Sequence, residues 1–313
     1  MTPTMRAIVQ HRLGGPEVLE AAEVPRPEPG IGEILVRVHA AGANPVDFKV
    51  RENGGYDGAR PPFTVGWDVS GTVEAVGFGV RIFQPGDEVY GMMPFPQIGG
   101  GYSAYVTAPA RTFDAKPSAL GHVEAAALPL AGLTAHQALV DTAGVQPGQR
   151  VLVHAAAGGV GHLAVQIAKA RGAFVIATAS AAKHGFLRSI GADRVIDHTA
   201  VDFADELTGL DVVLDPVGGE DHTARSASVL RDGGTLVTID DPAPLPEPHR
   251  GRIASGFMTV AADWSGMRAL SRMVEEGSLA PAIARTHPLE DAAEAHEALE
   301  SGRTVGKIVL TLD

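Results

Sequence analysis

One stretch in the middle of the chain constrains the fold more than any other. An apolar run typical of a strand, 151–155, leads directly into Ala156, Gly158 and Gly161, and a helix-type pattern follows at 160–170. The three small residues have the spacing of the Gly-x-Gly-x-x-Gly fingerprint, with alanine in the first place. A tight turn, a backbone without side chains and a helix N-terminus together present N–H groups to a pyrophosphate. The stretch therefore predicts a dinucleotide-binding turn, and a plain structural turn from strand to helix is the alternative.

The residues after this turn alternate between strand and helix patterns. Apolar runs predict strands at 174–178, 194–196, 211–215, 235–239 and 257–260, and helix-prone runs predict helices at 181–190, 202–207, 221–230 and 265–276. Two further helix-prone runs precede the turn, at 123–128 and 133–143. Apolar strands that alternate with helices predict a parallel, doubly wound sheet with right-handed crossovers. The proline-rich stretch 242–248 cannot be a central strand and predicts an exposed, semi-rigid loop.

The part of the chain before residue 119 has a different texture, with short strand patterns bounded by Gly and Pro clusters. Strands are expected around 7–9, 33–40, 69–76, 88–91 and 104–106, with a helix at 45–51. Towards the C-terminus a helix at 289–299 and a strand at 307–312 follow, and we expect this strand to complete the first sheet. The sequence thus predicts an α/β protein with two domains. Residues 1–118 and 284–313 form a β-rich substrate domain, 119–283 form a nucleotide-binding domain, and the site lies in the cleft between them.

Composition and charge limit the classes of partner and site. The 313 residues carry a formal net charge of -12 and no long basic run, which argues against nucleic acid or an anionic membrane as the main partner. There is no cysteine, which excludes a disulfide framework, a thiolate nucleophile and any cysteine-containing zinc site. No apolar run reaches the length of about 18 residues that a membrane helix needs, and residues 1–10 lack the apolar core of a signal peptide. We therefore expect a cytoplasmic location.

Several segments together resemble the medium-chain dehydrogenase/reductase superfamily, in its zinc-independent, zeta-crystallin-like quinone oxidoreductase branch. The matching segments span nearly the whole chain in the expected order: 29–36, 44–47, 66–73, 84–89, 155–161, 191–193 and 306–310. The resemblance implies a GroES-like β-rich substrate domain plus a doubly wound Rossmann domain. It also implies NADPH as cofactor, reduction of quinones or activated C=C bonds by hydride transfer, and a homodimer that pairs through the segment 256–260.

The nucleotide turn and the resemblance together indicate a set of cofactor contacts. These are Thr134, Ala156, Gly158, Gly159, Val160, Gly161, Thr178, Ser180, Lys183, His198, Val217, Thr238 and Ile239. Rossmann domains that prefer NAD place an acid about 20 residues after the glycines, where it binds the ribose 2′-hydroxyl. Here that position is Ala179, and Ser180 and Lys183 beside it offer a hydroxyl and an ammonium to a 2′-phosphate, which favours NADPH. The alternative is that Ser180 caps the following helix and Lys183 is solvated.

For the substrate side, the resemblance points to Asn44, Asp47 and Tyr56 as catalytic candidates, with Trp67 close by. We expect Asn44 to orient the nicotinamide or a substrate oxygen, and Tyr56 to donate a proton or stack on a quinone. The alternatives are a helix cap for Asp47, a surface position for Tyr56 and a core position for Trp67. Zinc-dependent relatives carry Cys where Asn44 stands and His-Glu where Trp67 and Asp68 stand, so no metal is expected.

These residues predict an enzyme that reduces a small-molecule quinone or enone with NADPH and without a metal. Two alternatives keep the same fold. One is a non-catalytic NADPH-binding protein that acts as a redox sensor or structural component, and the other is an enzyme whose cleft catalyses a non-redox step.

Overall fold

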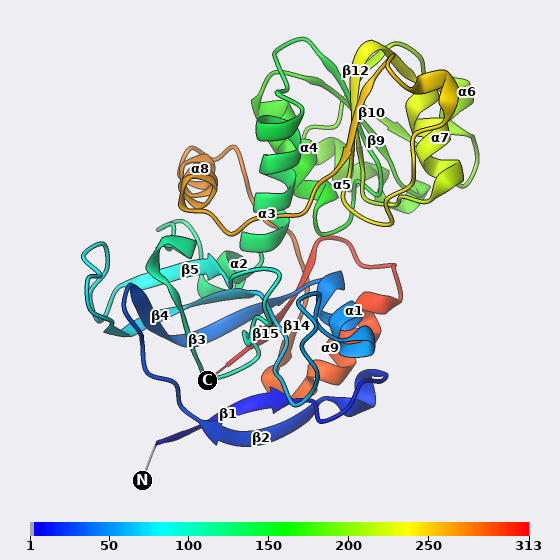
Figure 1. Ribbon diagram of the computed structural model, residues 1–313. Coiled ribbons are helices and arrows are strands. Elements are labelled where there is room, and N and C mark those ends of the chain that lie inside the picture. Colours follow the sequence, from blue (N-terminus) through cyan, green and yellow to red (C-terminus); the bar gives the residue numbers. More distant parts are fainter. Residues whose placement is uncertain (1–2, 313) are drawn as a thin grey trace. The chain divides into compact units, whose positions relative to one another are not determined.

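A computed structural model describes residues 3–312 of the chain (Figure 1). Contacts between residues divide the chain into two units. The first unit takes the chain up to Leu133 together with Ala261–Gly277 and the part from Pro281 onward, and the second takes Thr134–Val260 and Ser278–Ala280. Within residues 3–312, no helix has the length and apolar character needed to cross a membrane.

The first unit is built on a mostly antiparallel, seven-stranded sheet. Its strand order is β14 (Ile283–Pro288), β15 (Lys307–Thr311), β3 (Glu33–Ala43), β4 (Asp68–Val76), β5 (Glu88–Met92) and β7 (Phe113–Ala115), with β6 (Tyr105–Pro109) paired to β3. A separate antiparallel pair consists of β1 (Thr4–Val9) and β2 (Glu20–Pro25). The main helices of this unit are α1 (Pro45–Asn53), α2 (His122–Ala126), α8 (Trp264–Glu275) and α9 (Ala292–Glu300). Because β15 pairs antiparallel with β3, the prediction that the last strand completes this sheet is confirmed.

The second unit is a six-stranded parallel sheet with the strand order β10-β9-β8-β11-β12-β13. These strands are β8 (Arg150–Val153), β9 (Phe174–Thr178), β10 (Arg194–Ile196), β11 (Leu210–Asp215), β12 (Leu230–Thr238) and β13 (Ala254–Phe257). The connecting helices are α4 (Gly161–Ala170), α5 (His184–Ser189), α6 (Phe203–Glu206) and α7 (Glu220–Ser228). Helix α4 lies on one face of the sheet and the pair α6 and α7 lies on the other, as Figure 1 shows. The predicted doubly wound sheet is confirmed, and its strand order reverses between β8 and β11.

Helices on both faces explain why the central strands of the second unit are apolar throughout. Val151, Leu152 and Val153 on β8 are completely buried, as is Val213 on β11. Each side chain of this size contributes roughly 1.5–3 kcal/mol by leaving water. The strand ends are therefore fixed by a rigid core, which is what a ligand site at the edge of the sheet requires.

Several element boundaries differ from the sequence-based expectation, including those of β13 and α3. Strand β13 covers Ala254–Phe257 rather than 257–260, because it pairs in register with β12, whose last residue, Thr238, faces Phe257. The helix expected at 133–143 begins earlier, as α3 (Pro129–His136), since proline suits a first helical position where no N–H partner is needed. Its second half, Gln137–Thr142, is a π-helix.

The division by contacts also differs from the predicted domain boundaries, 1–118 with 284–313 and 119–283. Helices α2 and α8 are grouped with the first unit. The Tyr90 hydroxyl on β5 donates to the Met267 carbonyl on α8 at 3.1 Å, so α8 packs against the β-rich sheet. The predicted domain boundaries remain a prediction.

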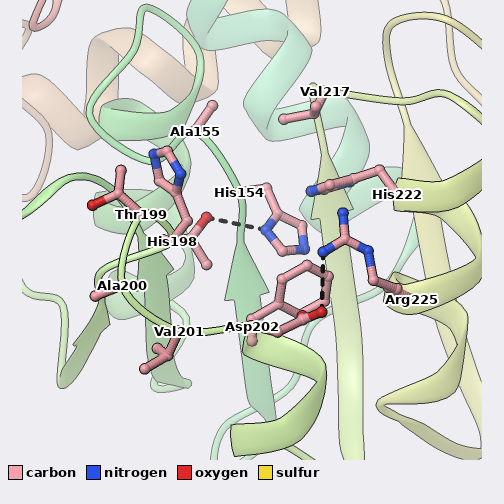
Figure 2. Close-up of a pocket in the computed structure, with 12 residues that line it drawn as sticks. His154, Ala155, His198, Thr199, Ala200, Val201, Asp202, Val217, His222 and Arg225 are labelled. Atoms are coloured by element: carbon pink, nitrogen blue, oxygen red, sulfur yellow. Dashed lines mark hydrogen bonds and ion pairs between the residues drawn. The ribbon is translucent and has the colours of Figure 1, made fainter.

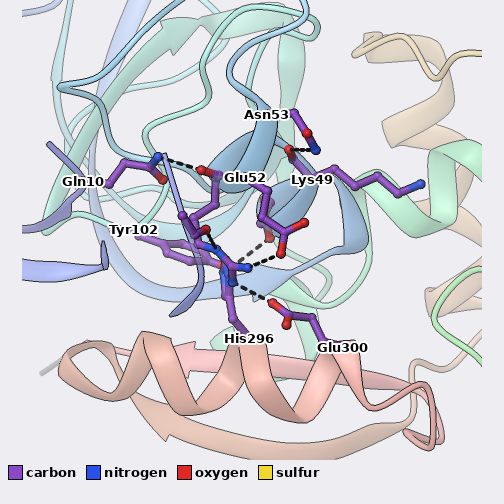
Figure 3. A network of polar contacts seen from close by, with 10 residues as sticks. Gln10, Lys49, Glu52, Asn53, Tyr102, His296 and Glu300 are labelled. Atoms are coloured by element: carbon purple, nitrogen blue, oxygen red, sulfur yellow. Dashed lines mark hydrogen bonds and ion pairs between the residues drawn. The ribbon is translucent and has the colours of Figure 1, made fainter. Parts of the chain in front are cut away.

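A buried network of charged and polar side chains joins α1 to α9 in the first unit (Figure 3). The Arg51 side chain is fully buried, and its Nη1 donates to Glu300 Oε1 at 2.6 Å and to His296 Nδ1 at 3.1 Å. Its Nε donates to the Gly14 carbonyl at 2.9 Å, and its Nη2 donates to Glu52 Oε1 at 2.6 Å. Arg51 therefore ties the C-terminal turn of α1 to two other segments, helix α9 and the loop at Gly14.

The network also has a fixed direction, because arginine can only donate hydrogen bonds. His296 Nδ1 must accept from Arg51, and burial together with the Arg51 charge lowers the pKa of His296 to about 3, so the ring is neutral. Its proton therefore sits on Nε2, which donates to the Tyr102 hydroxyl at 3.2 Å. Tyr102 in turn donates to Asp47 Oδ2 at 2.9 Å, so the chain of hydrogen bonds ends at the start of α1.

Replacing Arg51 with methionine is expected to destabilise the protein strongly. The substitution leaves Glu300 and His296 without their donor, and losing one member of a buried ion pair costs about 3–5 kcal/mol. Urea unfolding followed by circular dichroism measures the loss. The control is Arg6→Gln, which breaks an exposed pair with Glu290 and should cost about 1 kcal/mol or less. Equal losses in the two variants would contradict this role of the network.

Candidate functional site

The turn predicted to bind a dinucleotide forms a tight loop between β8 and α4. A Cβ atom on Gly161 would lie 2.5 Å from the Ala155 carbonyl oxygen and 2.6 Å from Ala156 Cα, so glycine is needed where the helix meets the loop. Ala155 has a positive φ of 43°, and the Ala156 amide donates to the Thr178 carbonyl on β9 at 3.1 Å. Residues 158–160 are partly exposed, and amides at a helix N-terminus have no partner within the helix. The loop is therefore shaped as a cradle for an anion.

A cavity of about 500 Å³ opens beside this loop (Figure 2). Its lining follows the C-terminal ends of β8, β9, β10 and β11, where the strand order reverses and where doubly wound sheets bind ligands. Three residues predicted to contact the cofactor, Thr178, His198 and Val217, are brought together in this lining. The volume lies within the range of about 300–1,000 Å³ that is typical of small-molecule sites.

The side of the cavity next to α7 carries a hydrogen-bonded polar group. Asp215, at the end of β11, accepts from His222 Nδ1 at 2.9 Å, and its other oxygen accepts from the amides of Val217 at 2.9 Å and Gly218 at 3.1 Å. Burial alone would raise the pKa of the Asp215 carboxyl, but the hydrogen bond from His222 and the nearby imidazoles lower it overall. Burial and the neighbouring His222 lower the pKa of His154 to about 3, so the His154 ring is neutral. The sequence analysis did not single out His222 or His154.

The remaining predicted cofactor residues outside the glycine loop lie at other strand ends. Ser180 and Lys183 belong to the short helical turn after β9, and the Ser180 side chain makes no capping hydrogen bond. Thr238 and Ile239 stand at the end of β12, and Thr134 is buried in α3. None of these five residues lines the cavity of Figure 2. Their contacts with a cofactor remain a prediction.

In the first unit, Asn44 belongs to a buried cluster with Asp68 and Lys307. Asn44 Nδ2 donates to Asp68 Oδ2 at 2.9 Å, and Asn44 Oδ1 accepts from the Lys307 ammonium. Lys307 Nζ also lies 3.0 Å from the Ala43 carbonyl and 3.3 Å from Asp68 Oδ2, so its three donors face three acceptors. The second oxygen of Asp68 accepts from the Leu130 amide at 2.6 Å. Both polar ends of the Asn44 side chain are thus engaged inside the protein.

Asp47 is also completely buried. Its Oδ2 accepts from the Asn44 backbone amide at 2.6 Å, which is the Asp47 contact of a capping box at the start of α1, and also from the Tyr102 hydroxyl at 2.9 Å. Within residues 3–312, Asp47 Oδ1 has no hydrogen-bond partner. Burial raises the pKa of Asp47 to about 7. The geometry matches the alternative role of helix cap, and the catalytic role of Asp47 remains a prediction.

Tyr56 is the accessible member of the three predicted catalytic residues. Its side chain is 61% exposed and packs edge-on against Phe95, with ring centroids 5.6 Å apart. Phe95 in turn packs edge-on against Trp67 at 5.9 Å. Trp67 is fully buried and its indole N–H donates to the Gln97 carbonyl at 3.0 Å, so Trp67 occupies the core position considered as its alternative.

Two sequence families match the chain. The alcohol dehydrogenase GroES-like domain matches residues 30–118, and the family described as zinc-binding dehydrogenase matches residues 190–310. The quinone oxidoreductase of Sus scrofa is 33% identical, with 98% of each chain covered. The chain belongs to the quinone oxidoreductase branch of the medium-chain dehydrogenase/reductase superfamily. The predicted family is therefore confirmed, and this member of it is an oxidoreductase.

Solved structures of relatives carry several reaction names. An NAD-dependent alcohol dehydrogenase is 37% identical with a TM-score of 0.90, and the comparison covers 99% of this chain and 100% of that one. The CurK enoyl reductase is 29% identical with a TM-score of 0.89, and it covers 98% of this chain and 99% of its own. The fold is thus shared across the whole chain by relatives with different substrates.

The family implies a nicotinamide cofactor, and the second unit fits one. Gly161 allows the N-terminus of α4 to pack closely against the loop, since a side chain there would collide with Ala155, and the amides of such a helix terminus suit a pyrophosphate. The neighbouring cavity offers ring and hydroxyl groups of His198 and Thr178 to the rest of a nucleotide. The polar side chains of the cavity and the shape of the loop therefore fit a nicotinamide dinucleotide.

A zinc ion, in contrast, does not fit this chain. At the positions that hold ligands in zinc-dependent relatives, the buried Asn44 and Asp68 side chains are bridged by the Lys307 ammonium, whose charge would repel a cation. Across residues 3–312, no group of three or more His, Asp or Glu side chains is arranged to hold a metal. The description of the matching family as zinc-binding therefore does not extend to the residues of this protein.

The buried Asp47 predicts a defined pH dependence of stability. Its pKa is 3.8 in a model peptide and about 7 in the folded protein, so the unfolded chain releases the proton first. The contribution of Asp47 is full below pH 3.8 and is lost as the pH rises through about 7. We expect Asp47→Asn, which stays neutral, to show a smaller fall in unfolding free energy between about pH 4 and about 7 than the wild type.

Urea unfolding at several pH values measures this difference. Asp232→Asn is the control, because that side chain is 86% exposed and the substitution should leave the pH dependence nearly unchanged. Parallel pH curves for Asp47→Asn and the wild type would contradict the raised pKa of Asp47.

Proposed function

We propose that this oxidoreductase is a zinc-independent, NADPH-dependent reductase of quinones or of the activated C=C bond of α,β-unsaturated carbonyls. The observation that carries the proposal is the joint placement of the glycine loop and the 500 Å³ cavity at the point where the strand order reverses. The reaction class is supported by relatives named quinone oxidoreductase and enoyl reductase.

The preference for NADPH rests on residues at the end of β9. Ala179 leaves no carboxylate at the position that grips a ribose 2′-hydroxyl in NAD-specific domains. Ser180, which makes no capping hydrogen bond, and Lys183 are available for a 2′-phosphate. Asp197 directly follows the next strand, β10, and its carboxylate already accepts from the amide of Thr199 at 2.9 Å and from the Thr199 hydroxyl at 2.6 Å. One relative is named as NAD-dependent, so the preference needs a direct measurement.

When bound, the nicotinamide cofactor supplies a hydride, and the residues of this chain supply binding, orientation and a proton. The N-terminus of α4 holds the pyrophosphate through backbone amides. Tyr56, exposed on its loop, donates a proton to the substrate or stacks against a quinone ring. Asn44 and Asp47 act by positioning, because their buried contacts fix the start of α1, the helix that leads to the Tyr56 loop.

The test is the oxidation of NADPH and NADH, followed by their ultraviolet absorbance, with a panel of quinones and enones. We expect turnover with NADPH and a lower kcat/KM with NADH. Lys183→Met should lower kcat/KM for NADPH by roughly tenfold and leave NADH nearly unchanged, because a hydrogen bond to a charged group is lost. A chelator should have no effect. NADPH binding without turnover across the panel would favour the redox-sensor alternative, and chemical change of a panel compound without NADPH oxidation would favour a non-redox step.

The cellular location and the oligomeric state of the protein are also proposals. We expect it to act in the cytoplasm, which a fluorescent fusion would check. We also expect a homodimer. Strand β13 is the edge of the six-stranded sheet, and all four of its residues, Ala254–Phe257, are exposed. An exposed edge strand offers unpaired backbone groups to a second chain, and Phe257 adds an apolar side chain that is 51% exposed.

Phe257→Asp should weaken this pairing, because it places a charge on each of two edges that meet. Light scattering should give a dimer for the wild type and a smaller mass for the variant at low micromolar concentration. The matched control is Phe174→Asp, a 44% exposed phenylalanine at the start of β9, away from that edge. A monomeric wild-type protein would overturn the proposal.

A further inference from the structure

The inner wall of the cavity is formed by residues that the sequence analysis did not connect with a ligand. His154 follows β8, Phe203 begins α6, and His222 and Arg225 lie on α7. Figure 2 shows the His222 imidazole extending from α7 toward the middle of the cavity. These side chains line the same cavity as Ala155 of the glycine loop, so they would meet a part of a nucleotide that extends from the loop into the cavity.

The charge of Arg225 is balanced at this end of the cavity. Arg225 Nη1 lies 3.3 Å from Asp202 Oδ2, and Nη2 lies 2.9 Å from Asp221 Oδ2. Its guanidinium also stands over the ring of the buried Phe203, with 5.3 Å between Cζ and the ring centroid. A cation with two carboxylate partners and an aromatic neighbour suits a neutral, planar ring better than a further phosphate.

The protonation pattern of His222 follows from its partner. Asp215 holds its carboxylate with a lowered pKa and accepts from His222 Nδ1, so Nδ1 carries a hydrogen. Within residues 3–312, no side chain or backbone group forms a hydrogen bond with His222 Nε2. In the neutral ring this nitrogen is a hydrogen-bond acceptor that is left for the cavity.

No other imidazole nitrogen on this wall is equally available. The ring of His154 packs edge-on against His222 with centroids 4.4 Å apart, and both of its nitrogens are engaged. His154 Nδ1 lies 3.0 Å from Thr178 Oγ1, and His154 Nε2 lies 3.3 Å from Ser226 Oγ. His222 is thus the one ring on the inner wall that presents an open acceptor to a ligand.

We propose that His222 is a specificity-determining residue that reads the purine base of the cofactor, with Nε2 accepting a hydrogen bond from the exocyclic amine of adenine. A 6-oxo purine such as hypoxanthine presents an acceptor at the same position, so it would face His222 Nε2 without a hydrogen between them. The site therefore selects 6-amino over 6-oxo purine dinucleotides. This inference rests on the proposed function, because it assumes that the cavity holds the adenosine end of the cofactor.

The test is equilibrium binding, by isothermal titration calorimetry, of NADPH and of its hypoxanthine analogue at about pH 8. The wild type should bind NADPH roughly tenfold more tightly than the analogue, the effect of one buried hydrogen bond with its acceptor left unpaired in the analogue. His222→Phe keeps a ring against His154 but removes the acceptor, so it should bind both dinucleotides with similar affinity.

Two further variants serve as controls. His222→Gln keeps a donor for Asp215 and an acceptor for the base, so it should retain part of the preference. His198→Phe changes the opposite wall of the same cavity. It should weaken the binding of both dinucleotides without changing the ratio of their dissociation constants. Circular dichroism checks that each variant is folded. If His222→Phe fails to fold, the proposal is tested by the ratio of the two dissociation constants in the wild type and in His222→Gln.

The outcomes separate this inference from the function on which it rests. Equal affinity of the wild type for both dinucleotides, or an unchanged ratio in folded His222→Phe, would overturn the role of His222 and leave a nucleotide-binding reductase in place. Absence of binding for either dinucleotide would overturn the proposed function itself.

Discussion

The close approach of α4 to the loop after β8 is the contact on which the second unit depends. At Gly161 there is no room for a Cβ atom, because the Ala155 carbonyl and the Ala156 backbone occupy that space. This packing brings the N-terminus of α4 to the edge of the sheet while the loop stays narrow enough to leave its amides accessible. The cavity lies at the same place. From β8 the strand order proceeds to β9 and β10 on one side and to β11 and β12 on the other, so the connections diverge there.

In the first unit, an ammonium lies at the centre of the buried polar cluster. Lys307 neutralises the buried Asp68 carboxylate and fixes the orientation of the Asn44 amide, so the cluster needs no cation from solution. A buried charge pair is tolerated only when every donor and acceptor in it is satisfied, and here both residues have full sets of partners. The cost is that the Asn44 side chain has no open polar group, which shifts the expected contacts with substrate towards the exposed Tyr56 loop.

Local patterns explain which features the sequence could predict. The order of strands and helices between residues 150 and 276, the Gly161 turn and the last strand could be predicted, because each depends on neighbours in the chain. Strands β2, β7 and β14 were not, since they are short or have few β-branched residues and are ordered by their partners. The polar clusters could not be predicted either, because their members are far apart in the sequence. Lys307 is 263 residues from Asn44, and Arg51 is 245 residues from His296, so no spacing indicates that they meet.

Asp215 connects two features of the cavity wall, which are the conformation of the loop after β11 and the tautomer of His222. One of its oxygens accepts from the amides of Val217 and Gly218 and so fixes the loop after β11, and the other sets the tautomer of His222. The conformation of the loop is demanding, because Gly218 has a φ of 70° and a Cβ there would collide with the Asp240 backbone. A substitution of His222 therefore affects the hydrogen bond to Asp215 as well as the proposed hydrogen bond to the base. When the ring no longer donates to Asp215, that carboxylate keeps a buried, unpaired oxygen next to the loop. Base recognition and loop geometry are for this reason expected to change together in His222→Phe, whereas His222→Gln, which keeps a donor to Asp215 and an acceptor for the base, should disturb both less.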